Sequence, residues 1–362
     1  MRPIEVFDVA GEGHALGFAV GRRFQSKIRR AVRAADRAIG RRLPDAHRQF
    51  DAVLDDYVSV ARGAMPHLAD EVEGTADGAG ISPRALFYAN AAEEMLDGMR
   101  RTEAALKAAE AAGDRCTTVA VRTNRSAPTG ILGHNEDVPI FYRPTQYALR
   151  MRLPSGVRIL AYTYAGLIPA IGLNDAGFGM ACASVWPIDA RIGIPRLFVA
   201  RAMLEARSIE DAIAIATMPD RAGGYGHQVA DANGRTAWIE TTATQGRVGW
   251  GDGWSVHTNH YQDPGLARMQ HPHTANSEAR LASARKLAPL ATDDIGGVAR
   301  MLGYHRRGGH SICRHPRTDG DRFRFGTIGS VILDLGARVG YFSTDQPCRG
   351  AFTRVDLDAV TT

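Results

Sequence analysis

The sequence predicts a layered α+β fold. Residues 12–112 place apolar side chains at the three- and four-residue steps of helices, whereas short β-type runs separated by turn residues begin at residue 116. Two further helical patterns follow towards the C-terminal end, before the last strands. Runs of strands flanked by helices on both sides favour layers of helix on sheet over a repeating strand–helix alternation.

The first part of the chain is expected to be helical. Apolar residues recur with helical spacing in LGFAVGRRFQSKIRRAVRAADRAIGRRL and again in FDAVLDDYVSVARGAM. In ISPRALFYANAAEEMLDGM, Ser82 can serve as an N-cap with Pro83 at the first helical position. The stretch RTEAALKAAEAAGDR loses its large apolar residues, so it is expected to be an exposed connector that ends near Gly113.

The second part is expected to be mainly strands. The first β-type runs are TTVAVRT, GILGHNED, YALRMRL, VRILAYTYA and GFGMACASV. A helical pair follows, and its second member begins where Ser208 and Asp211 have capping-box spacing. The later elements are strands in HQVADANG, TAWIETT and WSVHTNHY, helices over about residues 276–288 and 293–303, and strands in TIGSVILDL and RVGYFST.

Composition argues against several classes of function. The 362 residues carry a net charge of +5, but the positive charge is almost all arginine, spread among alanines without a basic or aromatic stripe. We therefore expect no nucleic-acid partner. No run of 18 or more apolar residues is present, so no membrane-spanning helix is expected.

Cysteine usage and the start of the chain indicate a cytoplasmic protein. The four cysteines are far apart and form no CxxC pair, which disfavours a disulfide framework. The opening MRPIEVFDVAGEGHALG has no apolar core or cleavage site of a secretory signal. A reducing compartment is therefore the expectation.

Familiar catalytic, nucleotide-binding and metal-binding motifs are absent from the sequence. There is no G-x-S-x-G elbow, no Walker A loop and no H-E-x-x-H. His257 and His260 form an H-x-x-H pair without a third ligand at a sensible spacing, and His305, His310 and His315 recur every five residues, which fits neither a helix face nor a strand face. We expect no metal and no cofactor.

Cys116 is the strongest candidate for chemistry. It heads a predicted strand directly after the expected connector, and cleavage of the Arg115–Cys116 bond would make it an N-terminal residue with a thiol and a free α-amino group. The pKa of such an amine is about 7.7–8.0 and that of a free thiol about 8.5, so the amine can act as base for its own nucleophile. No histidine is then required.

From about residue 10 to residue 350, the chain resembles the acyl-coenzyme A:6-aminopenicillanic acid acyltransferase (isopenicillin N acyltransferase) family of autoproteolytic N-terminal-nucleophile hydrolases. The order and spacing of nine segments carry the resemblance, and three of them, RCTTVAV, GHNEDV and VHTNHY, hold the pieces tied to catalysis. The other six are GHALGFAVGRRF, EVEGTADGAGISPRALFYANAAEE, GLIPAIGLNDAGFGMA, IPRLFVARAMLEARSIEDAIAIA, VADANGRTAWIE and SICRHP.

The resemblance implies a role for five residues. Cys116 matches the nucleophile, Asp137 matches an acidic residue that orients the α-ammonium, and Asn259 matches the donor to the tetrahedral oxyanion. Arg314 falls where the family often has an arginine, and Thr118 is a candidate supporting or substrate-binding residue. Read without the resemblance, Asp137 is a turn residue, Asn259 a strand-end cap and Arg314 a surface charge.

The resemblance also implies the fold and the processing. The fold is a four-layer αββα sandwich with an N-terminal helical segment, in one integrated domain that self-cleavage divides into associated chains of residues 1–115 and 116–362. The substrate is a small amide or acyl donor, acyl-CoA among them. The family usually has glycine before the cysteine, whereas this chain has Arg115 there, which leaves self-cleavage open.

Two alternatives remain on the sequence alone. In the first, the chain stays intact and Cys116 pairs with His134 or His257 as a cysteine–histidine hydrolase. In the second, less favoured, the chain is a basic protein whose arginines bind RNA or an anionic surface in a salt-dependent way.

Overall fold

Two β-sheets form the centre of the molecule. The computed structural model describes residues 3–42, 46–99, 116–124, 126–271, 275–292, 294–307, 309–316 and 325–359. The larger sheet has the order β1-β4-β5-β6-β7-β8-β9-β10 and the smaller one β11-β2-β3-β12-β13-β14. In chain order the strands are β1 (Val6–Ala10), β2 (Thr117–Arg122), β3 (Gly130–Pro139), β4 (Gln146–Arg152), β5 (Arg158–Tyr164), β6 (Ile171–Asn174), β7 (Phe178–Ser184), β8 (Tyr225–Asp231), β9 (Thr236–Thr241), β10 (Gly246–Trp250), β11 (Trp254–His257), β12 (Phe325–Asp334), β13 (Val339–Ser343) and β14 (Thr353–Asp356).

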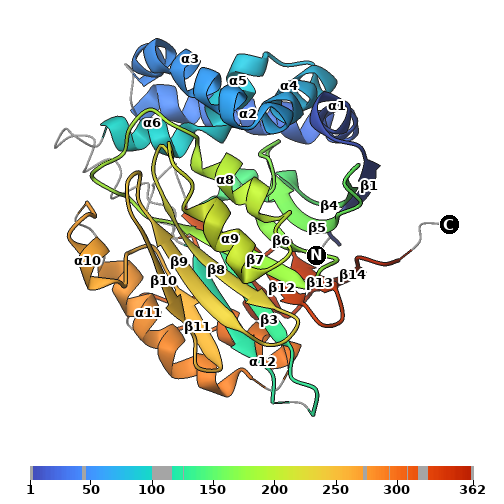
Figure 1. Cartoon of the computed structure of the whole chain (residues 1–362), viewed down its shortest axis with the longest axis vertical. Coiled ribbons are helices and arrows are strands. Elements are labelled where there is room, and N and C mark those ends of the chain that lie inside the picture. The colour runs from blue at the N-terminus through green and yellow to red at the C-terminus, as the bar shows by residue number, and fades with distance from the viewer. Residues whose placement is uncertain are drawn as a thin grey trace.

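Helices cover the outer face of each sheet. The N-terminal helices form one group at the end of the molecule that is blue in Figure 1, whereas the orange helices lie beside the smaller sheet. The α-helices are α1 (Gly13–Arg23), α2 (Gln25–Arg42), α3 (Ala46–Ala64), α4 (Pro66–Ala79), α5 (Pro83–Asn90), α6 (Ala92–Met99), α8 (Arg196–Met203), α9 (Ile209–Ala216), α10 (Pro264–Ala267), α11 (Ala275–Leu287) and α12 (Ile295–Leu302); short 3-10 turns are η1 (Ile140–Thr145), η2 (Ala288–Leu290) and η3 (Pro347–Arg349).

Three apolar clusters separate four layers. The first packs the N-terminal helices with α8 and α9 on the larger sheet, the second lies between the sheets, and the third packs α11 and α12 on the smaller sheet. Strand alternation divides the side chains between clusters: in β2, Val119 and Val121 face the helices whereas Ala120 faces the other sheet. The layered α+β fold predicted from the sequence, and the αββα arrangement that the resemblance implies, are confirmed.

The N-terminal segment is an integral part of this architecture. Strand β1 pairs in parallel with β4 at the edge of the larger sheet. Helix α1 lies so close to α4 that a Cβ atom on Gly17 would fall 2.0 Å from the carbonyl oxygen of Glu71. A larger residue at Gly17 would therefore push the two helices apart.

Most sequence-predicted elements are present. Helix α9 begins as expected, because Ser208 accepts a hydrogen bond from the backbone N–H of Asp211 at 3.0 Å. Helix α5 begins after Ser82 with Pro83 in its first turn, although the Ser82 side chain makes no capping bond. The sequence reasoning missed the short strands β1, β6, β10 and β14. The connector expected at residues 101–115 lies outside the described residues.

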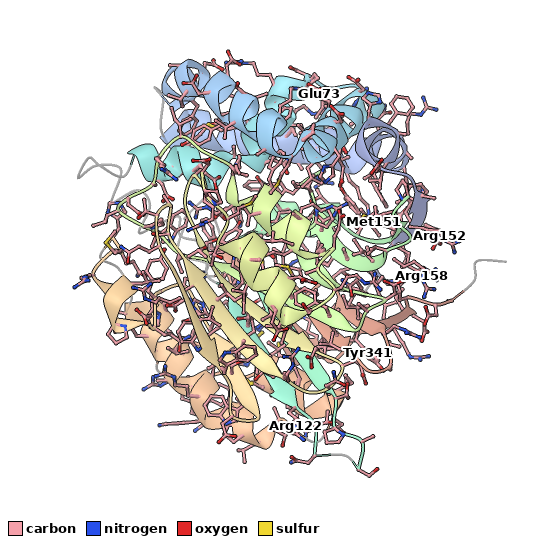
Figure 2. All side chains as sticks on the ribbon, in the orientation of Figure 1. Glu73, Arg122, Met151, Arg152, Arg158 and Tyr341 are labelled. Atoms are coloured by element: carbon pink, nitrogen blue, oxygen red, sulfur yellow. The ribbon has the colours of Figure 1, made fainter. Side chains whose placement is uncertain are left out.

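Charged side chains are distributed around the described part of the molecule. Figure 2 labels Arg122 near the lower end, far from Arg152 and Arg158, which lie opposite each other on β4 and β5. Other arginines are buried in ion pairs: Arg196 with Glu94 at 2.8 Å, and Arg201 with Glu71 at 3.1 Å. Dispersed and paired arginines do not favour a nucleic-acid surface. None of the helices described is both long and apolar enough to span a membrane.

Candidate active site

Cys116 lies at the start of β2 in the interior of the molecule. Its side chain is only 4% exposed. Strand β2 pairs antiparallel with β3, with Thr117 opposite Asn135 and Thr118 opposite His134, so Cys116 approaches Glu136. The thiol of Cys116 lies 3.9 Å from Oε1 of Glu136. The candidate nucleophile is therefore next to a buried carboxylate that the sequence reasoning did not select.

The two faces of β3 carry different groups. Leu132 packs between the sheets and Ile131 packs under the helices, so alternation places His134 and Glu136 between the sheets. A ring nitrogen of His134, Sγ of Cys116 and a carboxylate oxygen of Glu136 all lie within 4.8 Å of one another. Nε2 of His134 is 3.0 Å from Oε2 of Glu136, and the Tyr164 hydroxyl donates to Oε1 at 3.4 Å. Asp137, one residue on, faces the helical layer.

Arg280 of α11 joins Cys116 to Asn259. The Arg280 side chain is completely buried, and Nη1 donates to the carbonyl oxygen of Cys116 and, at 2.9 Å, to the Thr117 hydroxyl. Nη2 donates to Oδ1 of Asn259 at 2.8 Å. Because an arginine only donates, this contact fixes the oxygen of the Asn259 amide towards Arg280 and leaves Nδ2 as the donor end.

The donor end of Asn259 is positioned by β7. Nδ2 of Asn259 donates to the carbonyl oxygen of Ser184 at 3.0 Å, and the Asn259 backbone N–H donates to Ser277 at 2.6 Å. A carboxamide nitrogen carries two hydrogens, and Ser184 accounts for one of them. The other can donate to a developing oxyanion.

Asp137 is completely buried, and Arg314 lies near enough for its positive charge to influence it. Oδ1 of Asp137 accepts a hydrogen bond from the Thr327 hydroxyl at 2.6 Å. Oδ2 of Asp137 and Nη1 of Arg314 are buried with no hydrogen-bond partner among the described residues. Burial raises the pKa of Asp137 to about 6, although the positive charges of Arg314 and Arg280 oppose this change. Buried polar groups that lack a hydrogen-bond partner are candidates for contact with a ligand or a reacting group.

Arg314 is influenced by both Asp137 and Cys116. Burial lowers the pKa of its guanidinium, while these two acidic groups raise it. Its backbone N–H donates to the Thr327 hydroxyl at 2.9 Å, and its carbonyl accepts from the Thr327 N–H at 3.0 Å. The segment that carries Arg314 is therefore fixed to the same threonine that binds Asp137.

Thr118 and His257 have structural contacts. The Thr118 hydroxyl donates to the His257 carbonyl at 3.4 Å, which ties β2 to β11. Nε2 of His257 is 2.8 Å from Glu240, whose carboxylate also accepts the backbone N–H groups of Gln262 and Asp263. His257 is thus engaged away from Cys116, whereas His134 is beside it.

A chain of polar contacts extends from the N-terminal helices to the site. The Ser184 hydroxyl donates to Oε1 of Glu93 on α6 at 2.8 Å, and the Ser184 carbonyl accepts from Asn259. Arg196 of α8 contacts Glu93, Glu94 and Asp97 on α6. Residues that precede Cys116 in the chain therefore help to position Asn259.

The structure brings most of the sequence-predicted residues together. Cys116 and Asn259 meet through Arg280, and Arg314 lies close enough to Asp137 and Cys116 for their charges to affect it. Arg115, the expected cleavage position, lies outside the described residues. Sequence reasoning missed Arg280 and Glu136. Strand alternation could have found Glu136, since it shares a face of β3 with His134.

A protein-family model matches much of the chain. Residues 122–349, more than half of the chain, match the family described as acyl-coenzyme A:6-aminopenicillanic acid acyl-transferase. The matched range contains Asp137, Asn259 and Arg314 and begins after Cys116. No curated protein matches the chain.

Several solved structures are similar to this chain. A cysteine-to-alanine variant of conjugated bile acid hydrolase from Clostridium perfringens is similar with a TM-score of 0.50 and 13% identity, over 68% of this chain and 95% of that one. A Caenorhabditis elegans orthologue of N-acylethanolamine-hydrolyzing acid amidase has a TM-score of 0.43 and 14% identity, over 61% and 93%. Penicillin V acylase from Agrobacterium tumefaciens has a TM-score of 0.43 and 12% identity, over 63% and 82%. The first of these likenesses shows that this chain shares the fold of that hydrolase.

Proposed function

The chain belongs to the acyl-coenzyme A:6-aminopenicillanic acid acyl-transferase family, and from that premise we propose that Cys116 is the nucleophile of a self-cleaving amidohydrolase or N-acyltransferase. The family makes the chain an amide hydrolase or acyltransferase of the N-terminal-nucleophile type. The proposal adds the nucleophile, the cleavage and the roles of individual residues. We propose a small amide or acyl donor, acyl-CoA among them, as substrate.

One observation carries the proposal. A single buried guanidinium, that of Arg280, holds the carbonyl of Cys116 and the side-chain oxygen of Asn259. A nucleophile and an oxyanion donor held by the same rigid group keep their separation during the reaction, so little reorganisation is needed in the transition state. A cysteine that merely filled the core would not require this arrangement.

Self-cleavage begins with addition of the Cys116 thiol to the carbonyl carbon of Arg115. The Arg115–Cys116 C–N bond breaks as the Cys116 nitrogen takes a proton, which leaves a thioester and a free α-amine. Water then hydrolyses the thioester, giving the Arg115 carboxylate and restoring the thiol. The products are chains of residues 1–115 and 116–362.

The released α-amine supplies the base for turnover. It takes the thiol proton as sulfur attacks the acyl carbon, and returns it to the leaving group, an amine from an amide or a thiol from acyl-CoA, so that the acyl group becomes a thioester on Cys116. Water or an acceptor amine then removes the acyl group. In this scheme Asn259 donates to the oxyanion, and Asp137 orients and stabilises the α-ammonium. Arg314 binds a polar or anionic part of the substrate, and Thr118 supports β2.

The two chains are proposed to remain associated after cleavage. The ion pairs between Arg196 and α6, and between Arg201 and Glu71, cross from one chain to the other and are buried. Separation would expose the apolar cluster that packs the N-terminal helices on the larger sheet. The buried ion pairs and the buried apolar surface both oppose dissociation of the two chains.

Mass measurement of the purified, denatured protein tests the cleavage. We expect two fragments, with the break between residues 115 and 116, and one uncut chain for Cys116→Ala. The matched control is Cys182→Ala, which removes another buried thiol and should be cleaved normally. An uncut and fully active wild-type chain would overturn the proposal.

A second candidate function is supported by the position of His134 beside Cys116 and Glu136. The ring of His134 is near the Cys116 thiol, and Nε2 is oriented by Glu136, an arrangement that suits a cysteine–histidine hydrolase acting without cleavage. An uncut active wild-type chain that loses activity in His134→Ala would favour this alternative.

A further inference from the structure

Four side chains with metal-binding atoms, three of them exposed and that of Cys313 buried, lie together near the end of α12. They are His305, Cys313 and His315 from one loop and Cys348 from η3, and their ligand atoms all lie within 4.8 Å of one another. Nε2 of His315 is 3.2 Å from Sγ of Cys348 and 3.9 Å from Sγ of Cys313. The rings of His305 and His315 have centroids 5.0 Å apart.

We propose that these four residues bind a structural zinc ion. Zinc binds two thiolates and two imidazoles in a tetrahedron, and its bond lengths of about 2.3 Å to sulfur and about 2.0–2.1 Å to nitrogen place neighbouring ligand atoms roughly 3.3–3.8 Å apart. The distances from Nε2 of His315 to the two sulfur atoms, 3.2 and 3.9 Å, lie on either side of this range. Small side-chain rotations would therefore bring the ligand atoms to zinc-binding distances. Thiolate and imidazole ligands select zinc over magnesium or calcium.

The backbone already holds the ligands in place. The Cys313 N–H donates to the Tyr304 carbonyl at 3.1 Å, which closes the loop between His305 and Cys313. Gly303 lies so close to η3 that a Cβ atom there would be 3.2 Å from Cα of Cys348. Preorganisation of this kind lowers the entropy that metal binding must overcome. Binding would displace the thiol protons of Cys313 and Cys348 to solvent.

The position of the cluster suggests what the ion does. Arg314 lies between two of the ligands, and its backbone is bonded to Thr327, which in turn donates to Asp137. An ion on Cys313 and His315 would therefore fix the loop that presents Arg314 to the candidate active site. Four protein ligands complete the tetrahedron, so the site would be structural and would not activate water.

Metal content of the full-length protein tests this inference independently of catalysis. Protein purified without chelator under reducing conditions is expected to contain about one zinc per chain. Cys348→Ser and His305→Gln change exposed ligands, so folding is expected to survive while zinc content falls at least several-fold. His310→Gln, a change in the same loop outside the cluster, should retain the zinc.

Cobalt provides a second readout. Cobalt bound in place of zinc should give a thiolate-to-metal charge-transfer band that weakens in Cys348→Ser and persists in His310→Gln. The melting temperature of the wild type, but not of Cys348→Ser, should fall on addition of chelator. Wild-type protein without metal after incubation with zinc, unchanged zinc in both ligand variants, or a Cys313–Cys348 disulfide in protein kept free of oxygen would overturn the inference.

Discussion

Arg280 and Asn259 are joined by a hydrogen bond of 2.8 Å that fixes which end of the Asn259 amide donates. The same guanidinium contacts the carbonyl oxygen of Cys116, so α11 organises both parts of the candidate site. The buried arginine thus acts as a positioning residue.

Replacement of Asn259 tests the oxyanion assignment. Asn259→Ala should lower kcat by about 10²–10³-fold with a much smaller change in KM, because the donor acts mainly in the transition state. Asn276→Ala is the matched control, since Asn276 also accepts a hydrogen bond from Arg280, at 2.9 Å, on its other side. Equal losses in both variants would indicate that Asn259 serves only to hold Arg280.

The environment of Asp137 predicts a pH-dependent stability. Burial raises its pKa to about 6 from 3.8, so the folded chain favours the protonated carboxyl, and the resulting stability is lost as the pH rises through about 6. At neutral pH, where the carboxyl of Asp137 is ionised, the raised pKa corresponds to a loss of about 3 kcal/mol in the free energy of unfolding. In the uncut Cys116→Ala background, Asp137→Asn should therefore raise the free energy of unfolding at pH 7.5, and the gain should disappear below pH 4. A loss of stability at pH 7.5 would contradict the assignment.

The ion pairs between α8 and α6 predict how strongly the N-terminal segment is held. Arg196→Met leaves Glu94 and Asp97 buried without their cation, which should reduce the free energy of unfolding by about 3–5 kcal/mol. Denaturant titration measures the change in the free energy of unfolding when Arg196→Met is made in the uncut Cys116→Ala background. Arg354→Met removes an exposed arginine paired with Asp356 and is expected to have no measurable effect on the free energy of unfolding. Similar losses in the two variants would argue against a special role for the α8–α6 contact.

His134 separates the two catalytic schemes. If the α-amine of Cys116 is the base, His134→Ala should still self-cleave and should retain most of its kcat, because no histidine takes the thiol proton. An uncut wild-type chain whose kcat falls several hundred-fold in His134→Ala would assign the base to His134. Glu136→Gln tests the neighbouring carboxylate. If Glu136 acts by orienting the imidazole of His134, this substitution should change kcat in the same direction as His134→Ala.

The sequence predicts the layers of this fold better than its edges. Helical spacing and β-type runs identify the elements that face an apolar cluster, since burial selects their residues. Strands β6 and β14 are only four residues long, too short to show alternation. Their positions depend on pairing with neighbouring strands.

The candidate site is only partly predictable from the sequence, because some of its residues are positioned by contacts with distant elements. Cys116, Asp137 and Asn259 lie in segments with a family resemblance, whereas Arg280 lies in a polar helical stretch that predicts exposure to solvent. Arg280 is nevertheless completely buried, because its partners Cys116 and Asn259 come from other elements. The metal-binding cluster escapes sequence reasoning because Cys348 lies 33 residues after His315.

The most direct test traps the acyl group during turnover. Enzyme quenched in acid with its acyl donor should yield a peptide that begins at Cys116, with a free α-amine and the acyl mass on the sulfur. Cys116→Ala should yield no such peptide. Full turnover by a chain in which Cys116 is still peptide-bonded to Arg115 would contradict the account.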